Sequence, residues 1–126
     1  MNMRQIKKME AMTERLALAS KKGKVEPLLV KKTISKLKRL RAVPELGYLG
    51  RYSSDEVAKQ ALIELTKLKE VEQLKNFGEY ASEEVAKLAV SELEKLKALR
   101  ELEYLRINAL PEIAKLAVSA IERLFG

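Results

Sequence analysis

The amino-acid sequence repeats itself every 28 residues, and this period constrains the fold more than any other feature. Three segments align without gaps, at residues 48–68, 76–96 and 104–124, and one further shift reaches the more divergent segment 20–40. A period of this size is typical of repeat proteins, in which each unit packs on its neighbours. The sequence therefore predicts a tandem array of one structural unit.

One part of each unit has the pattern of an amphipathic helix. The same columns of the repeat are apolar throughout: Leu29, Val57, Val85 and Ile113 in one, and Leu37, Leu65, Leu93 and Ile121 in another. Within a unit the apolar residues are three or four positions apart, which places them on one face of a long helix. Ser54 and Ser82 precede two of these helices as N-caps. Pro27 and Pro111 occupy the first helical position in the other two.

A second apolar set lies between successive long helices. Its members are three residues apart: Val43, Leu46 and Leu49; Val71, Leu74 and Phe77; Leu99, Leu102 and Leu105. This spacing predicts a shorter helix, and Gly50 and Gly78 are expected at its C-terminal end. Each unit is then a helical hairpin, whose apolar face is buried only when hairpins stack on one another.

The residues that carry the repeat resemble a known family. The pattern Ser-[Asp/Glu]-Glu-Val-Ala-Lys-x-Ala stands at 54–61 and 82–89. It is similar to the short HEAT-like repeats of bilin-lyase-type and other α-solenoid proteins, with Lys where those repeats have Arg. This resemblance implies an all-α, right-handed α-solenoid of 28-residue hairpins, but no particular function. The repeats are expected at 20–47, 48–75, 76–103 and 104–126, in a single domain covering 1–126.

Residues 1–19 are predicted to be a half repeat that caps the N-terminal end of the array. Under the 28-residue shift, Ile6, Met9 and Met12 fall in the columns of a long helix. Leu18 falls in the column of Leu46, so a cap helix is expected over residues 3–15. All the methionines lie here: Met1, Met3, Met9 and Met12. They are interpreted as flexible apolar side chains that cover the end of the core, and the alternative is an adaptable surface that binds a partner.

Missing residue types exclude several kinds of chemistry. The chain has no His and no Cys, so it offers neither the commonest general base nor a thiolate nucleophile or zinc ligand. Acidic pairs such as Glu83 and Glu84 are explained by helix capping. We therefore expect a non-enzymatic protein with no metal, cofactor or small-molecule substrate. No stretch resembles a signal peptide or a membrane span, so a cytoplasmic location without membrane contact is expected.

Positive charge is concentrated towards the N-terminus. Residues 1–42 hold 13 Lys or Arg against three acids, whereas residues 43–126 hold 12 basic and 15 acidic residues. Such asymmetry is typical of nucleic-acid-binding proteins. The predicted phosphate contacts come from a basic loop and the first long helix: Lys21, Lys22, Lys24, Lys31, Lys32, Lys36, Lys38 and Arg39.

These residues predict a binding protein that docks its basic end on RNA or on a ribonucleoprotein such as the ribosome. Two alternatives stay open: a duplex DNA-binding protein, and a scaffold that binds a peptide or an acidic protein subunit. Tyr52 and Tyr80 share one column of the repeat. Repeat packing explains them better than base stacking, so recognition of single strands is not predicted.

The last long helix is more apolar than its equivalents. It carries Leu116 and Ala120 in columns that are mostly polar elsewhere, and Phe125 follows near its end. A terminal repeat is expected to be polar on its outer side. We therefore predict that Leu116, Ala120 and Phe125 join two copies in a homodimer, which would let the pair bridge or clamp its partner. The alternative is a local apolar surface covered by the chain end.

Overall fold

The computed structural model describes residues 2–23 and 25–126, and this part of the chain contains eight helices and no strands. The predicted all-α class is therefore confirmed. The helices are α1 (Met3–Lys21), α2 (Pro27–Arg39), α3 (Val43–Tyr52), α4 (Asp55–Lys67), α5 (Val71–Tyr80), α6 (Glu83–Lys95), α7 (Leu99–Asn108) and α8 (Pro111–Phe125). The even-numbered helices are the predicted long helices, and α3, α5 and α7 are the predicted shorter ones.

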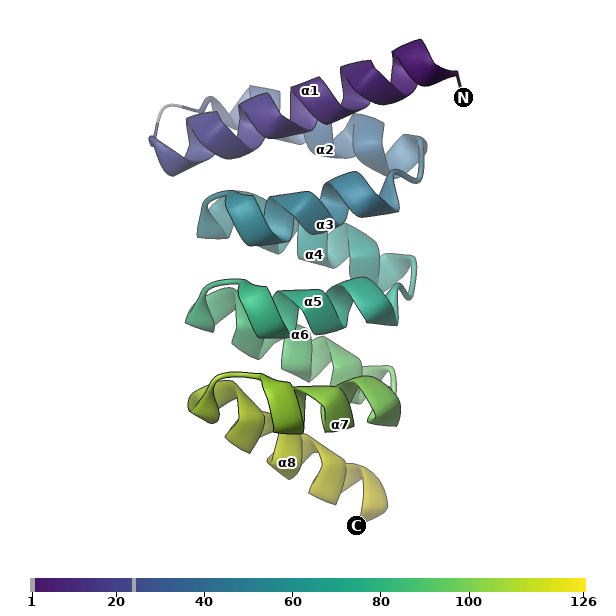
Figure 1. Cartoon of the computed structure of the whole chain (residues 1–126), viewed down its shortest axis with the longest axis vertical. Helices are drawn as coiled ribbons and strands as arrows, with labels where there is room; N and C mark the ends of the chain where they lie inside the picture. Colours follow the sequence, from purple (N-terminus) through teal and green to yellow (C-terminus); the bar gives the residue numbers. More distant parts are fainter. Residues whose placement is uncertain (1, 24) are drawn as a thin grey trace.

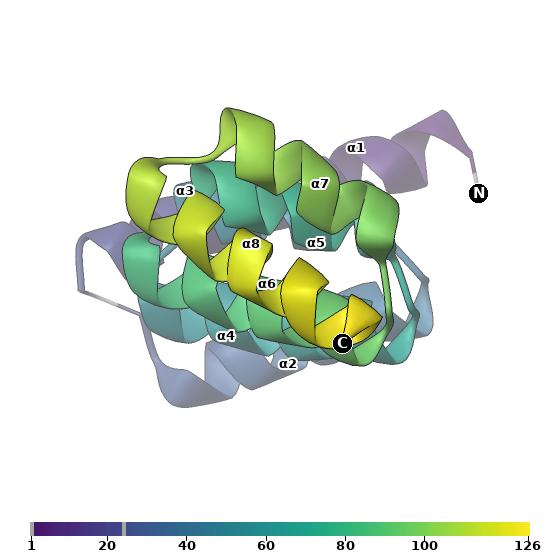
Figure 2. The same ribbon diagram turned by 90° about the horizontal axis from the view of Figure 1, so that it is seen from below.

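The helices follow one another along the long axis of the molecule in two layers (Figure 1). The odd-numbered helices form one layer and the even-numbered helices the other, as the end view in Figure 2 also shows. Each helix contacts the next helix of its own layer, and each even helix packs on the odd helix that precedes it. The connections from odd to even helices lie along one side of the stack, at the left of Figure 1. We name this side the odd–even edge.

One apolar core runs between the two layers. Its centre is formed by leucines with no exposed surface: Leu46, Leu74 and Leu102 from the odd layer, and Leu37, Leu65 and Leu93 from the even layer. Ile121, in the column of Leu37, is only partly buried. Leu29 departs from its column, since it is exposed where Val57, Val85 and Ile113 are buried. The reason is that α2 packs less closely on α1 than the other even helices pack on their odd partners.

Gly50 and Gly78 lie inside α3 and α5, so their predicted role at the helix ends is wrong. A Cβ atom on Gly50 would lie 2.1 Å from Cζ of Phe77. A Cβ atom on Gly78 would lie 2.6 Å from Cδ1 of Leu105. The two glycines therefore allow α3 to approach α5, and α5 to approach α7.

The even helices begin at the predicted positions, although the Ser54 side chain accepts no capping hydrogen bond. Pro27 and Pro111 are the first residues of α2 and α8, and Ser54 and Ser82 precede α4 and α6. The Ser82 hydroxyl accepts a hydrogen bond from the N–H of Val85 at 3.4 Å.

The ends of the even helices share a conformation that the sequence does not reveal. The residue after the C-cap has a positive φ in three of them: 51° at Arg41, 56° at Lys69 and 56° at Lys97. The next residue then donates its N–H to the carbonyl five positions back, as Ala98 does to Leu93 at 2.9 Å. This is the Schellman ending, in which the left-handed position is usually glycine.

The first helix differs from the predicted cap. It continues to Lys21 and stacks on α3 in the odd layer, although the 28-residue shift aligned it with an even helix. Leu18 is accordingly exposed, unlike Leu46. The register breaks because residues 22–26 separate α1 from α2, whereas residues 53–54 are enough to separate α3 from α4. Met9 is buried and Met12 packs against the core, Met3 is exposed, and Met1 lies outside the described residues.

Candidate nucleic-acid interface

Four of the predicted basic residues line one open hollow on α2. Lys31, Lys32, Lys36 and Arg39 stand on one face of this helix, where their side chains and those of Leu28 and Ser35 line a shallow depression that is open to solvent. Their arrangement follows from the amphipathic pattern of the helix, because the apolar residues Val30, Ile34 and Leu37 are buried in the core. We name Lys31, Lys32, Lys36 and Arg39 the α2 basic face.

The α2 basic face has no internal counter-charge. No carboxylate in residues 2–23 or 25–126 forms an ion pair with any of its four cations. Later even helices are different, because several of their cations have acidic partners: Lys59–Glu84 at 2.5 Å, Lys87–Glu83 at 3.2 Å and Lys95–Glu92 at 3.3 Å. Like charges three or four residues apart on a helix repel one another. An anionic ligand would therefore relieve a repulsion that exists on α2 alone among the described helices of this layer.

The remaining predicted residues are dispersed around this face. Lys38 pairs with α4, because its Nζ lies 3.5 Å from Oε2 of Glu64, a carboxylate that also pairs with Lys67. Lys21 and Lys22 are exposed at the end of α1, on the odd–even edge. Lys24 lies outside the described residues. The structure thus brings together four of the eight predicted contacts.

A further cation, Lys8, was not among the predicted contacts. Lys8 and Lys36 line a second hollow of about 300 Å³ between α1 and α2, with Gln5 and Met9. The positive surface therefore continues from α2 onto α1. The charge surplus of residues 1–42 was the signal for this extension, but the sequence did not show that α1 lies beside α2.

The packing interpretation of Tyr52 and Tyr80 holds only in part, because Arg51 of α3 packs on the ring of Tyr80 of α5 but neither tyrosine belongs to the core. The two residues are 44% and 49% exposed, so about half of each is left open to solvent. Both stand at the last position of an odd helix, on the odd–even edge. The shared column indicated a common environment but not whether that environment was the core or the surface.

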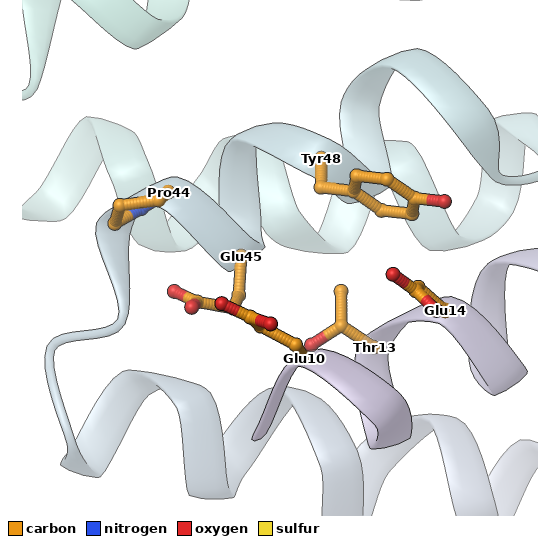
Figure 3. Close-up of a pocket in the computed structure, with 6 residues that line it drawn as sticks. All are labelled: Glu10, Thr13, Glu14, Pro44, Glu45 and Tyr48. Atoms are coloured by element: carbon orange, nitrogen blue, oxygen red, sulfur yellow. The ribbon is translucent and has the colours of Figure 1, made fainter. Parts of the chain in front are cut away.

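A hollow of opposite charge lies in the odd layer, between α1 and α3 (Figure 3). It has a volume of about 250 Å³ and is lined by Glu10, Thr13, Glu14, Pro44, Glu45 and Tyr48. The side chains of Glu10 and Glu45 extend towards each other across it. Carboxylates repel phosphate groups, so this hollow is an unfavourable place for a polyanion.

Ion pairs in the later repeats shift the pKa values of the residues that form them. The hydrogen bond to Glu84 is the main reason that the pKa of Lys59 is raised. The hydrogen bond from Arg123 is the main reason that the pKa of Glu94 is lowered. Arg123 belongs to α8 and Glu94 to α6, so this pair also joins the last two even helices.

The three predicted dimer residues have different environments. Phe125 is 77% exposed, Leu116 is partly buried, and Ala120 is completely buried. Ala120 therefore offers no surface to a second copy. Its small side chain stands in the column of Glu64 and Glu92, and α8 packs more closely on α6 than α6 does on α4. The apolar end of the molecule instead includes Ile107 and Leu110, which are 65% and 71% exposed.

No protein-family model, curated protein or solved structure matches this chain. Across residues 2–23 and 25–126, no group of three or more His, Cys, Asp or Glu is placed to hold a metal ion. None of the described helices is both long enough and apolar enough to span a lipid bilayer.

Proposed function

We propose that this chain is a non-catalytic cytoplasmic binding protein whose α2 basic face docks on RNA or on a ribonucleoprotein such as the ribosome. The observation that carries the proposal is the gathering of Lys31, Lys32, Lys36 and Arg39 in one hollow, without an acidic partner among the described residues. Contacts from Lys and Arg to phosphates supply affinity that does not depend on sequence. Lys8, Lys21 and Lys22 extend the same positive surface onto α1.

The proposal is tested by charge reversal on α2. Fluorescence anisotropy would measure the binding of a labelled RNA hairpin at several salt concentrations. Lys32→Glu combined with Lys36→Glu should weaken binding by at least tenfold, and the plot of log affinity against log salt should become less steep by about 1.5, since each lost phosphate contact removes about 0.7–0.9. The matched control is Lys87→Glu with Lys95→Glu on α6, which makes the same change in charge where each Lys has an acidic partner.

Four results would contradict the proposal. An absence of RNA binding at low salt would exclude it, and an equal loss in the α6 control would show that only net charge matters. Tighter binding to duplex DNA than to RNA would favour the DNA-binding alternative. Specific binding of an acidic peptide at physiological salt, with no binding of either nucleic acid, would favour the protein scaffold.

We also propose that the stacked helix pairs form a right-handed α-solenoid of HEAT-like type. The 28-residue period, the two helices in each unit and the contacts between successive helices of each layer support it. An experimentally determined structure would test it directly. A left-handed superhelix would contradict the proposed architecture.

A further inference from the structure

Three tyrosines and an arginine form a surface cluster across α3 and α5, in which Tyr52, Tyr80 and Arg51 are exposed and Tyr48 is partly buried. The Cζ atom of Arg51 lies 4.3 Å from the ring centroid of Tyr80 and 5.3 Å from that of Tyr52. The ring centroids of Tyr48 and Tyr52 are 4.5 Å apart, with their planes tilted by 39°. Together with Gln73 and Asn76, these residues line an open hollow of about 300 Å³. We name Tyr48, Arg51, Tyr52 and Tyr80 the aromatic–arginine cluster.

The cluster adjoins the positive surface at the odd–even edge. The N–H of Ser54 donates a hydrogen bond of 2.9 Å to Oγ of Ser20, which holds the end of α1 against the turn between α3 and α4. Lys21 and Lys22 follow Ser20 directly, and α2 begins on the same edge (Figure 1). The carboxylates of Figure 3 line the neighbouring hollow between α1 and α3, so the favourable path for phosphates from the cluster follows the edge towards Lys21 and Lys22.

The chemistry of the cluster suits unpaired nucleobases. Exposed aromatic rings and the plane of an arginine are the surfaces on which the bases of single strands stack. The amides of Gln73 and Asn76 supply both donors and acceptors for base edges. Within the described residues Arg51 has no carboxylate partner, so its N–H groups are available to a phosphate while its plane rests on tyrosine.

We infer that the aromatic–arginine cluster binds the bases of single-stranded RNA, while the adjoining phosphates contact Lys21, Lys22 and the α2 basic face. This inference rests on the proposed function, because the basic face supplies the general affinity for the polyanion. It adds that the ligand contains an unpaired segment, since the bases of a duplex are stacked on one another and present no free faces to a ring. Tyr52 and Tyr80 stand 28 residues apart, so adjacent repeats offer equivalent positions to the strand.

The inference is tested with a 12-nucleotide uridine RNA and an abasic ribose–phosphate chain of the same length. Tyr52→Ala and Tyr80→Ala should each weaken binding of the uridine RNA about tenfold, because stacking of one base contributes roughly 5- to 150-fold in affinity. Binding of the abasic chain should be weaker and should not respond to either substitution. Tyr80→Phe keeps the ring and should retain the affinity, which separates loss of stacking from misfolding.

Intrinsic fluorescence gives a second readout. The chain has four tyrosines and no tryptophan, and three of the tyrosines belong to the cluster, so stacked bases should quench most of the emission. The fourth, Tyr104, is partly buried, and its hydroxyl donates to Oε1 of Glu79 at 3.1 Å. Tyr104→Phe is therefore the matched control, and it should leave the affinity for the uridine RNA unchanged.

Equal affinity for the uridine RNA and the abasic chain would overturn the inference, as would unchanged binding in both alanine variants. Preference for an RNA duplex over the single strand would do the same. In each case, if the Lys32→Glu, Lys36→Glu double variant still binds RNA more weakly than the unmodified chain, the proposed function is supported although the inference fails. If that double variant also binds normally, both the inference and the proposed function fail.

Discussion

The two glycines of α3, Gly47 and Gly50, should respond differently to substitution by alanine. A Cβ atom on Gly50 would meet the Phe77 ring, which is packed in the core, whereas one on Gly47 would meet Oε1 of Gln73, at the end of a flexible side chain. Gly50→Ala should therefore destabilise the protein by about 1–3 kcal/mol through overpacking, a cost larger than the helical gain. Gly47→Ala should be neutral or stabilise by up to about 1 kcal/mol, since Gln73 can move aside. Urea denaturation compares the two, and shifts of the same sign would contradict this explanation.

At the scale of single residues, the sequence predicts burial well and contact partners poorly. Apart from Leu18 and Ile121, the columns of Leu37 and Leu46 predicted the core correctly, because apolar spacing indicates the buried face of a helix. The function of Gly50 depends on Phe77, which is 27 positions away, and no local pattern reports such a neighbour. The exposure of Tyr52 also depends on residues far away in the sequence. Tyrosine occurs both in cores and on surfaces, and the stacking of α3 on α5 determines which environment Tyr52 has.

At the scale of helices, the endings of α2, α4 and α6 offer a direct gain in stability. Lys97 follows α6 with a φ of 56°, a conformation that costs an L-residue roughly 1–2 kcal/mol and glycine almost nothing. Lys97→Gly should stabilise the protein by about 0.5–1 kcal/mol after the larger chain entropy of glycine in the unfolded state is subtracted. Lys87→Gly, in the middle of α6, makes the same change in composition and should destabilise by about 1 kcal/mol. Thermal unfolding would show shifts of opposite sign, and a destabilised Lys97→Gly would contradict the prediction.

The ion pair between α6 and α8 predicts a dependence of stability on pH. The hydrogen bond from Arg123 lowers the pKa of Glu94, so the folded state releases this proton more readily than the unfolded state. The stabilisation is therefore complete above the unfolded pKa of about 4.3 and is lost as the pH falls through the lower folded value. Glu94→Gln should lower the urea midpoint near pH 7, and this difference should shrink at about pH 3. A difference that is the same at both pH values would show that the charge of Glu94 is not responsible.

For the whole molecule, the repeat period gave the element order, and it failed only where a connection changes length. Residues 22–26 break the register, so α1 occupies the odd layer although its apolar columns matched an even helix. The position of α1 in the odd layer also shapes the candidate interface, because the hydrogen bond between Ser54 and Ser20 holds the end of α1, with Lys21 and Lys22, beside the turn that follows Tyr52. The α2 basic face could be predicted from one helix alone. The aromatic–arginine cluster could not, because its members come from two stacked repeats.

One end of the stack has a basic surface and the other has exposed apolar side chains, and this difference favours association through the apolar end. The α2 basic face lies in the first helix pair, and the exposed Ile107, Leu110 and Phe125 lie in the last (Figure 1). Two copies that meet through their C-terminal ends would keep their basic faces apart, so the association would not be opposed by charge. It would cover apolar side chains that an ordinary terminal repeat replaces with polar ones.

We therefore expect a homodimer that a single charge at the C-terminal end disrupts. Phe125→Glu should produce monomers in light scattering at concentrations where the unmodified chain is dimeric, because pairing would bury an uncompensated carboxylate. Leu18→Glu is the matched control, since Leu18 is exposed on α1 in the first pair and should leave the dimer intact. An unmodified chain that is monomeric throughout would contradict the dimer, and an unchanged mass for Phe125→Glu would place the interface elsewhere. If the dimer forms, Phe125→Glu should also weaken binding to RNA long enough to reach both basic faces, while binding to a short hairpin stays the same.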